Sequence, residues 1–184
     1  YPLEGYLFPD TYYFANKEVP VKTIIETMLT EMDKNLTPYK DSITKSSLSV
    51  HEILTLASIL EKEGKTKDFK DISSVFHNRL AQGMKLQSCA TSYYGMGLEF
   101  SDVGIATYEM MNNKNPYNTY MIPGLPVGPI SMPGLQALDA AINPTETKNL
   151  FFISDNEGNT YFFETASEHS RKKDELIKNG KWKR

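Results

Sequence analysis

Apolar residues recur at helical spacing near the start of the chain. Between Val21 and Met32 they fall at positions i, i+3, i+4, i+7, i+8 and i+11, the period of a helix that buries one face. Pro20 precedes this run, where a helix tolerates proline because its first N–H groups have no partner inside the helix. The pattern therefore predicts an amphipathic helix over residues 21–32.

A capping signal opens the second regular stretch. Ser49 and Glu52 have the spacing of a capping box, in which each side chain accepts a hydrogen bond from the other residue's backbone N–H. We expect a helix from there to about Glu63, ended by the glycine that follows. Asp68 is expected to cap a third helix that ends at Gly83. These two helices are predicted to form a short hairpin.

The second half of the chain changes character. Glycine, proline and tyrosine punctuate residues 84–133, which predicts a long loop region of the kind that often carries binding or catalytic residues. Apolar spacing then predicts a short helix over 135–142. Strand-forming runs at 150–153 and 160–163 flank a turn-rich segment, which favours a β-hairpin, and Ser167 is the expected cap of a last helix.

Length and composition fit one globular domain. The chain has 184 residues, of which 40% are hydrophobic and 23% charged, and no linker divides it, so we predict a single α+β domain. A net charge of -3 provides no overall positive field, which argues against nucleic acid as a partner. The lone Cys89 excludes an internal disulfide. No apolar run approaches the roughly 18 to 20 residues that span a bilayer.

Common catalytic motifs are missing from the sequence. It contains no His-Glu-x-x-His, no Gly-x-Ser-x-Gly and no Walker loop. His51, His77 and His169 are far apart in the chain, so separate structural roles are favoured over a three-histidine metal site. A thiol nucleophile at Cys89 paired with His77 stays open as an alternative.

The helix predicted to end near Glu63 gives a stronger signal. At about 100° per residue, Glu63 lies on the same face as Leu56 and Leu60, whereas Glu61 points away from it. A carboxyl group among apolar residues at a helix C-terminus should have a raised pKa, as a general acid requires. The alternative is that the helix frays and Glu63 simply reaches solvent.

Several ordered motifs carry a resemblance to a known family. The chain resembles the catalytic domain of the MltG (YceG-like) endolytic murein transglycosylases. In that family the catalytic glutamate is the second Glu of a Glu-Lys-Glu motif, which matches Glu63. The resemblance includes the β-hairpin and these segments: Leu3–Tyr12, Leu56–Glu63, Val75–Leu80, Gly83–Ser88, Pro116–Tyr120 and Gly124–Ile130.

The resemblance implies an activity and a setting. It implies lysozyme-like active-site logic and an endolytic lyase that cleaves the MurNAc-β-1,4-GlcNAc bond of nascent peptidoglycan strands and leaves 1,6-anhydro-MurNAc ends. No metal and no organic cofactor is expected, and peptidoglycan synthases are the expected protein partners. A membrane helix and a LysM-like module are expected upstream of this domain, which would place it at the outer face of the cytoplasmic membrane.

Polar and aromatic residues of the loop region are candidates for binding the sugars. Amides and hydroxyls can hydrogen-bond sugar hydroxyl and acetamido groups, and tyrosine rings can cover the apolar face of a sugar. Packing of the loops against the core is the alternative role for each tyrosine. The candidates are Gln87, Ser88, Thr91, Tyr94, Asn118, Thr119 and Tyr120.

The chain departs from the family pattern in three places. Cys89-Ala90 stands where many members have Asp-Pro, Met132 stands where an Asn is common, and Phe69-Lys70 replaces an expected Glu-Arg pair. These changes affect loop contacts and leave Glu63 intact.

Two other functions are compatible with the sequence. One is a hydrolytic glycosidase in which Asp10 or Glu4 activates water while Glu63 acts as the acid. The other is a glycan-binding scaffold of wall synthesis that has lost catalysis.

Overall fold

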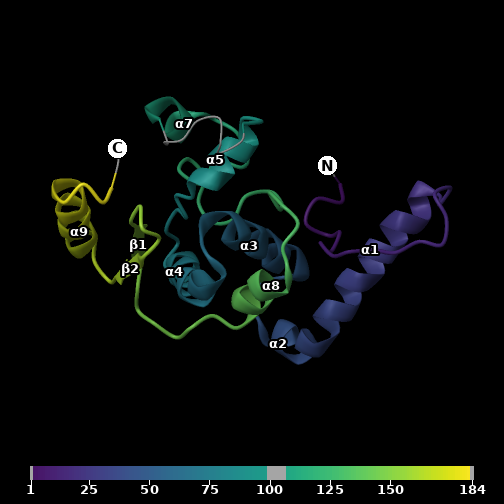
Figure 1. The fold of residues 1–184 in the computed structure, drawn as a ribbon. Helices are drawn as coiled ribbons and strands as arrows, with labels where there is room; N and C mark the ends of the chain where they lie inside the picture. The colour runs from purple at the N-terminus through teal and green to yellow at the C-terminus, as the bar shows by residue number, and fades with distance from the viewer. Residues whose placement is uncertain (1, 99–106, 183–184) are drawn as a thin grey trace.

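The computed structural model describes residues 2–98 and 107–182 and has one long helix at its centre (Figure 1). This helix, α3 (Val50–Glu63), begins with the predicted capping box between Ser49 and Glu52. All residues from Ile53 to Leu60 are buried, polar Thr55 and Ser58 included. Because α3 is covered on all sides, its C-terminal end has little freedom to shift.

Three helices pack against α3. They are α4 (Phe69–Ala81), α5 (Cys89–Gly95) and α8 (Leu135–Ile142). The short 3₁₀ turn η2 (Thr66–Asp68) joins α3 to α4, which confirms the predicted helical hairpin. Asp68 lies at the N-cap position of α4, but its carboxylate accepts a hydrogen bond from Thr160 Oγ1 at 2.9 Å instead of capping the helix.

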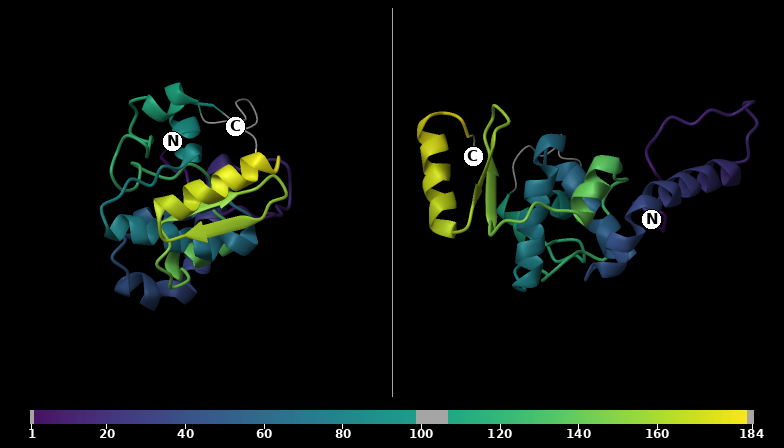
Figure 2. Two further views of the ribbon diagram at one scale, coloured as in Figure 1. Left: turned by 90° about the vertical axis from the view of Figure 1, so that its left-hand side faces the viewer. Right: turned by 90° about the horizontal axis from the view of Figure 1, so that it is seen from below.

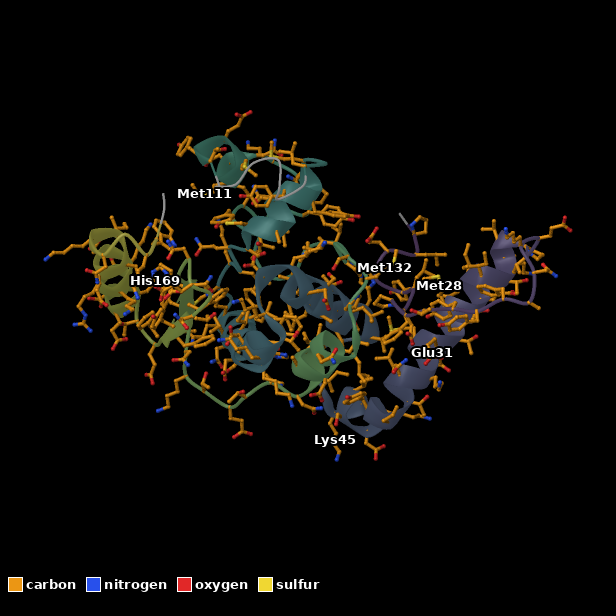
Figure 3. The ribbon with its side chains drawn as sticks, viewed as in Figure 1. Met28, Glu31, Lys45, Met111, Met132 and His169 are labelled. Atoms are coloured by element: carbon orange, nitrogen blue, oxygen red, sulfur yellow. The ribbon has the colours of Figure 1, made fainter. Side chains whose placement is uncertain are left out.

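The N-terminal part reaches away from this core. Helix α1 (Val21–Leu36) runs four residues beyond the predicted end, and η1 (Thr37–Tyr39) and α2 (Lys40–Lys45), which the apolar pattern did not predict, follow it. Figure 3 places Glu31 of α1 and His169 of α9 (Ala166–Lys178) at opposite ends of the molecule.

In its described residues the middle segment is mostly irregular, as predicted, but contains two short helices that the sequence analysis missed. They are α5 and α7 (Tyr108–Asn112), and they are too short to show an apolar period. Asn118 joins them: its buried amide donates to the carbonyl groups of Met110, Met111 and Asn113 and accepts from the Ser92 hydroxyl. Asn118 therefore holds this segment together from inside.

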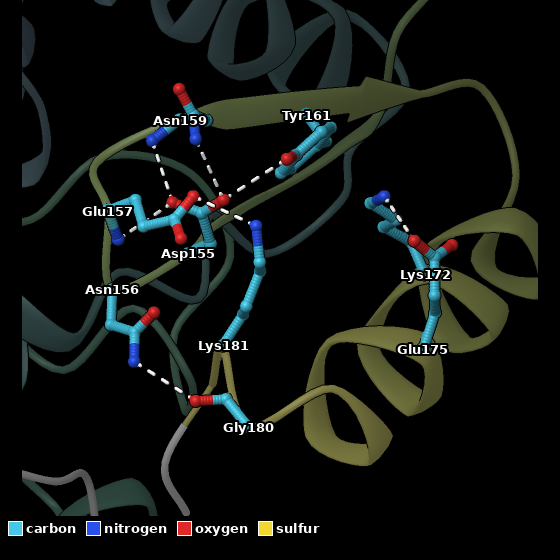
Figure 4. Close-up of polar contacts among 9 residues, drawn as sticks. All are labelled: Asp155, Asn156, Glu157, Asn159, Tyr161, Lys172, Glu175, Gly180 and Lys181. Atoms are coloured by element: carbon cyan, nitrogen blue, oxygen red, sulfur yellow. Dashed lines mark hydrogen bonds and ion pairs between the residues drawn. The ribbon is translucent and has the colours of Figure 1, made fainter.

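The predicted hairpin forms the only sheet among the described residues. Strands β1 (Phe151–Ser154) and β2 (Thr160–Phe163) are antiparallel, with Phe151 opposite Phe163. The turn between them closes on Asp155, which accepts hydrogen bonds from Asn159, Tyr161 and the Glu157 backbone (Figure 4). These bonds, those from Asn159 foremost, lower the pKa of Asp155 to about 2.

Helix α9 covers one face of the hairpin (Figure 2). Its cap is Thr165, which forms a capping box with Glu168, so the prediction of Ser167 as the cap was wrong. The Thr165–Glu168 box has the same three-residue spacing as the Ser49–Glu52 box. Thr165 stands two residues before Ser167 and is preferred as the cap because a Glu follows it three residues later. Among the described residues no helix has the length and apolar run needed to cross a bilayer.

Arg79 of α4 links the hairpin to the rest of the fold. Its Nε donates to the carbonyl oxygen of Leu150 at 2.6 Å, and its Nη1 donates to that of Leu86 at 2.8 Å. The guanidinium also lies 5.1 Å from the centre of the Phe151 ring. One buried side chain therefore fixes the start of β1 against the loop that follows α4.

The role of Asn118 can be tested by stability measurements. We expect Asn118→Ala to lower the free energy of unfolding by about 2 to 4 kcal/mol, because it leaves several buried carbonyl groups and a hydroxyl without partners. Asn112→Ala, which removes an exposed amide of α7, should cost no more than about 0.5 kcal/mol. Urea unfolding measures both, and equal losses would contradict the assignment.

Candidate active site

Glu63 is the last residue of α3 and lines three adjoining cavities. The first cavity, of about 360 Å³, is mainly apolar, with Tyr93, Tyr94 and Ile130 in its wall. The second, of about 560 Å³, lies between the loop after α4 and the C-terminal hairpin, and the third, of about 230 Å³, reaches the β1–β2 turn. One carboxyl group thus stands where the three spaces meet.

Two donors from the start of α5 hold the Glu63 carboxyl group. The Ser88 hydroxyl donates a short hydrogen bond to Glu63 Oε1, and the Ala90 backbone N–H donates a second. Burial raises the pKa of Glu63, and the two hydrogen bonds oppose that rise without cancelling it. The group therefore keeps its proton to a higher pH than an ordinary glutamate.

The two glutamates of the Glu-Lys-Glu segment lie in different surroundings, which confirms the helical-wheel prediction. Glu61 is exposed, and its Oε2 accepts a hydrogen bond from the Gly134 backbone N–H at 3.0 Å. The helix does not fray after Glu63, because the chain turns tightly against α4 at Gly64. A side-chain carbon at position 64 would lie 2.5 Å from Ile72 Cδ1.

An unusual backbone conformation aims Ser88 at Glu63. Gln87 has φ +54°, a left-handed conformation that costs a residue with a side chain roughly 1 kcal/mol or more. Thr119 secures it on the other side, since its carbonyl accepts from the Gln87 N–H at 3.2 Å and its hydroxyl accepts from the Ser88 N–H at 2.9 Å. No sequence pattern indicated this conformation.

The predicted sugar-binding residues fall into two groups. Gln87, Ser88 and Tyr120 line the second cavity, and Tyr94 lines the first. Thr91, Asn118 and Thr119 are fully buried and direct their polar atoms to partners within the protein. The second group therefore supports the cavity walls from behind.

The C-terminal part contributes cavity residues that the sequence analysis did not single out. They line the second cavity opposite Gln87 and Ser88, and the only hint in the sequence was the aromatic hairpin followed by a basic end. These residues are Phe151, Phe152, His169, Lys173 and Trp182.

The histidines occupy separate places. His51 bridges the Tyr6 hydroxyl and the Val127 carbonyl group, and His77 lies against the Ala141 carbonyl oxygen. His169 lies beside the aromatic rings of β1 and β2. In the described part of the chain no three His, Cys, Asp or Glu side chains are grouped to hold a metal ion.

Cys89 is not paired with His77. Its Sγ lies 3.0 Å from the Tyr120 hydroxyl, and burial raises the pKa of the thiol, which disfavours the thiolate that a nucleophile needs.

Comparison with known proteins gives consistent results. An "Endolytic murein transglycosylase" of Streptococcus pneumoniae strain D39 is 42% identical over 93% of this chain and 32% of its own length. One of Bacillus subtilis strain 168 is 38% identical over 96% of this chain and 49% of its own length. The chain thus spans a third to a half of these relatives.

A solved structure has the same fold. The crystal structure of a YceG-like protein from Listeria monocytogenes superposes with a TM-score of 0.86 at 42% identity, covering 92% of this chain and 55% of that one. The sequence pattern of the YceG-like family matches residues 1–175. The chain belongs to the YceG-like family.

Proposed function

We propose that this chain is the catalytic domain of an endolytic peptidoglycan lytic transglycosylase, with Glu63 as its single acid and base. The observation that carries the proposal is the buried carboxyl group with a raised pKa at the meeting point of three cavities. Among the described residues that line them, Glu63 is the only carboxyl group. The names of the relatives point to the same activity.

In the first step Glu63 acts as the acid. Its proton passes to the glycosidic oxygen between MurNAc and GlcNAc, and the bond from that oxygen to C1 breaks. The positive charge that develops at C1 is met by the substrate's own acetamido group. Burial raises the pKa of Glu63 and so favours the protonated form that this step needs.

In the second step the Glu63 carboxylate acts as the base. It takes the proton of the C6 hydroxyl while O6 bonds to C1, which closes the 1,6-anhydro ring. The hydrogen bonds from Ser88 and the Ala90 N–H stabilise the carboxylate between the two steps. This cycle returns the proton to Glu63 and needs neither metal nor organic cofactor.

The cavities on different sides of Glu63 suit cleavage inside a strand. Tyr94 offers an aromatic face in the first cavity, and Gln87 and Tyr120 offer polar groups in the second. We assign these three and Ser88 to contact with sugars. Thr91, Asn118 and Thr119 act by holding the walls in place.

The two other functions fit the site less well. A hydrolase needs a second carboxylate to activate water, and neither Glu4 nor Asp10 lines any of the three cavities. A scaffold without activity would not need a half-buried glutamate with a raised pKa at the centre of three cavities. Cys89 and Met132 differ from the family pattern, yet neither removes a donor from Glu63.

The setting of the whole protein is part of the proposal. A membrane helix and a LysM-like module upstream would hold this domain at the outer face of the cytoplasmic membrane, beside peptidoglycan synthases. Nascent glycan strands are the substrate that such a place supplies.

The role of Glu63 can be tested by product analysis. On uncrosslinked glycan strands, Glu63→Gln should lose about 100- to 10,000-fold in turnover, because an amide cannot supply the proton. The matched variant Glu61→Gln should keep most of the activity. Mass spectrometry of the parent's products should find 1,6-anhydro ends, and reducing ends would instead indicate a hydrolase.

The raised pKa of Glu63 predicts how stability depends on pH. Above its ordinary value of 4.5 the unfolded chain releases the proton that the folded chain keeps, so the stability contribution of Glu63 is lost as pH rises. Glu63→Gln should therefore become more stable relative to the parent between about pH 4.5 and the folded pKa. Thermal melting across this range measures it, and a constant difference would contradict it.

Ser88 should govern the high-pH limb of activity. Ser88→Ala removes a donor that favours the carboxylate, so the pKa of Glu63 should rise further and activity should persist to higher pH. The maximal kcat should fall about tenfold, because the intermediate carboxylate loses a hydrogen bond. Ser88→Thr, which keeps a hydroxyl, should restore both properties. A pH profile of kcat unchanged in Ser88→Ala would refute the contact.

A further inference from the structure

The cavities around Glu63 are basic, although the chain as a whole carries a net charge of -3. Among their described lining residues, four are cationic: Lys62, Lys65, Arg79 and Lys173. Glu63 is the one acidic group facing them, and it must be protonated to act. Positive charge is therefore concentrated where the substrate would lie.

These cations have no carboxylate partner among the described residues. Other lysines nearby do: Lys172 pairs with Glu175 at 2.8 Å and Lys181 with Glu157 at 3.0 Å (Figure 4). None of the ion pairs within 4.0 Å in the described chain includes a cation of the cavities. Unpaired cations gathered in a concave site favour an anionic ligand.

In the second and third cavities, the side chains of Lys173 and Lys65 each lie against a neighbouring residue. The Lys173 ammonium lies 4.7 Å from the centre of the Trp182 ring. The Lys65 side chain packs over the turn glycine Gly158, where a side-chain carbon would lie 2.0 Å from Lys65 Nζ. Lys173 is half-buried against Trp182, and a lysine restricted in this way loses less conformational freedom when it binds a ligand.

The first cavity differs from the other two. Its wall is largely apolar and aromatic, and Lys62 is its only cation among the described residues. This lining suits sugar rings. The second cavity contains Arg79 and Lys173, and the third contains Lys65 together with Lys62, which lines the first as well. The guanidinium of Arg79 is largely committed to backbone carbonyls. An anionic group of the substrate is therefore expected on the side of the β-hairpin and α9.

The sugars of a glycan strand are neutral, so the anionic group must come from a substituent. On muramic acid it is the lactyl branch, which ends in a free carboxylate or continues into a peptide that carries carboxylates. We propose that Lys65 and Lys173, which line adjoining cavities, bind carboxylate groups on the lactyl branches of the strand, so that the enzyme selects strands by this branch. This inference rests on the proposed function and names the part of the substrate that the site recognises.

The test uses two strand types and three lysine variants, one of which is a matched control. Uncrosslinked strands with intact peptides and strands freed of peptide by an amidase are offered to Lys65→Met, Lys173→Met and the control Lys172→Met. Methionine keeps the apolar stem and removes the charge. Lys172 is the neighbour of Lys173 on α9, but it pairs with Glu175 and lines none of the three cavities.

Binding is measured by fluorescence anisotropy with each lysine variant in the Glu63→Gln background, and turnover separately in the parent background. Lys65→Met and Lys173→Met should each weaken binding of one strand type about 3- to 10-fold, mainly through KM, and the loss should shrink at high salt. Lys172→Met should match its background protein. A loss confined to peptide-bearing strands identifies peptide carboxylates, and one confined to peptide-free strands identifies the lactyl carboxylate.

Two results would overturn the inference. One is binding of both strand types unchanged from the control, and the other is an equal loss on both, which would mean that the lysines act on the sugars or on the fold. Thermal melting of each variant shows whether an equal loss on both strand types comes from a change in the fold. The binding measurement does not depend on turnover. If the parent enzyme yields no anhydro ends, the proposed function is refuted, and the binding data still decide whether Lys65 and Lys173 recognise a carboxylate.

Discussion

The structure depends on keeping one carboxyl group, that of Glu63, partly shielded from water and at a fixed position. Burial alone would hold it as an inert acid, and hydrogen bonds alone would hold it as a carboxylate. Here both act together, since desolvation raises the pKa and the donors Ser88 and Ala90 lower it. A group balanced in this way can give a proton in one step and take one in the next.

The packing of α3 explains how that position is maintained. Residues 53–60 are covered on every face, so the helix cannot slide or rotate without opening the core. Polar Ser58 serves this purpose as well, because its hydroxyl accepts from the Ile130 N–H and its carbonyl accepts from Ser131. The end of α3 and the wall of the first cavity are thereby tied to each other.

Local signals in the sequence predicted the longer helices and the orientation of Glu63, and long-range contacts decided the rest. Ser49 and Glu52 are three residues apart, and the orientation of Glu63 follows from the helical period. The sequence was therefore enough to predict both the capping box and the orientation of Glu63. Asn118 looked like a sugar ligand because an amide suits either role, and only its surroundings show that it is enclosed. The left-handed Gln87 and the cavity face of Lys173 depend on segments distant in sequence.

The placing of positive charge near Glu63 is limited by the same need to keep the pKa of Glu63 raised. A cation in contact with Glu63 would lower its pKa and remove the proton that the first step needs. The shift in the pKa of Glu63 comes from burial, Ser88 and Ala90, and neither of its hydrogen-bond donors is a lysine of the cavities. Positive charge that lines the cavities without contacting Glu63 can attract an anionic substrate without ionising Glu63.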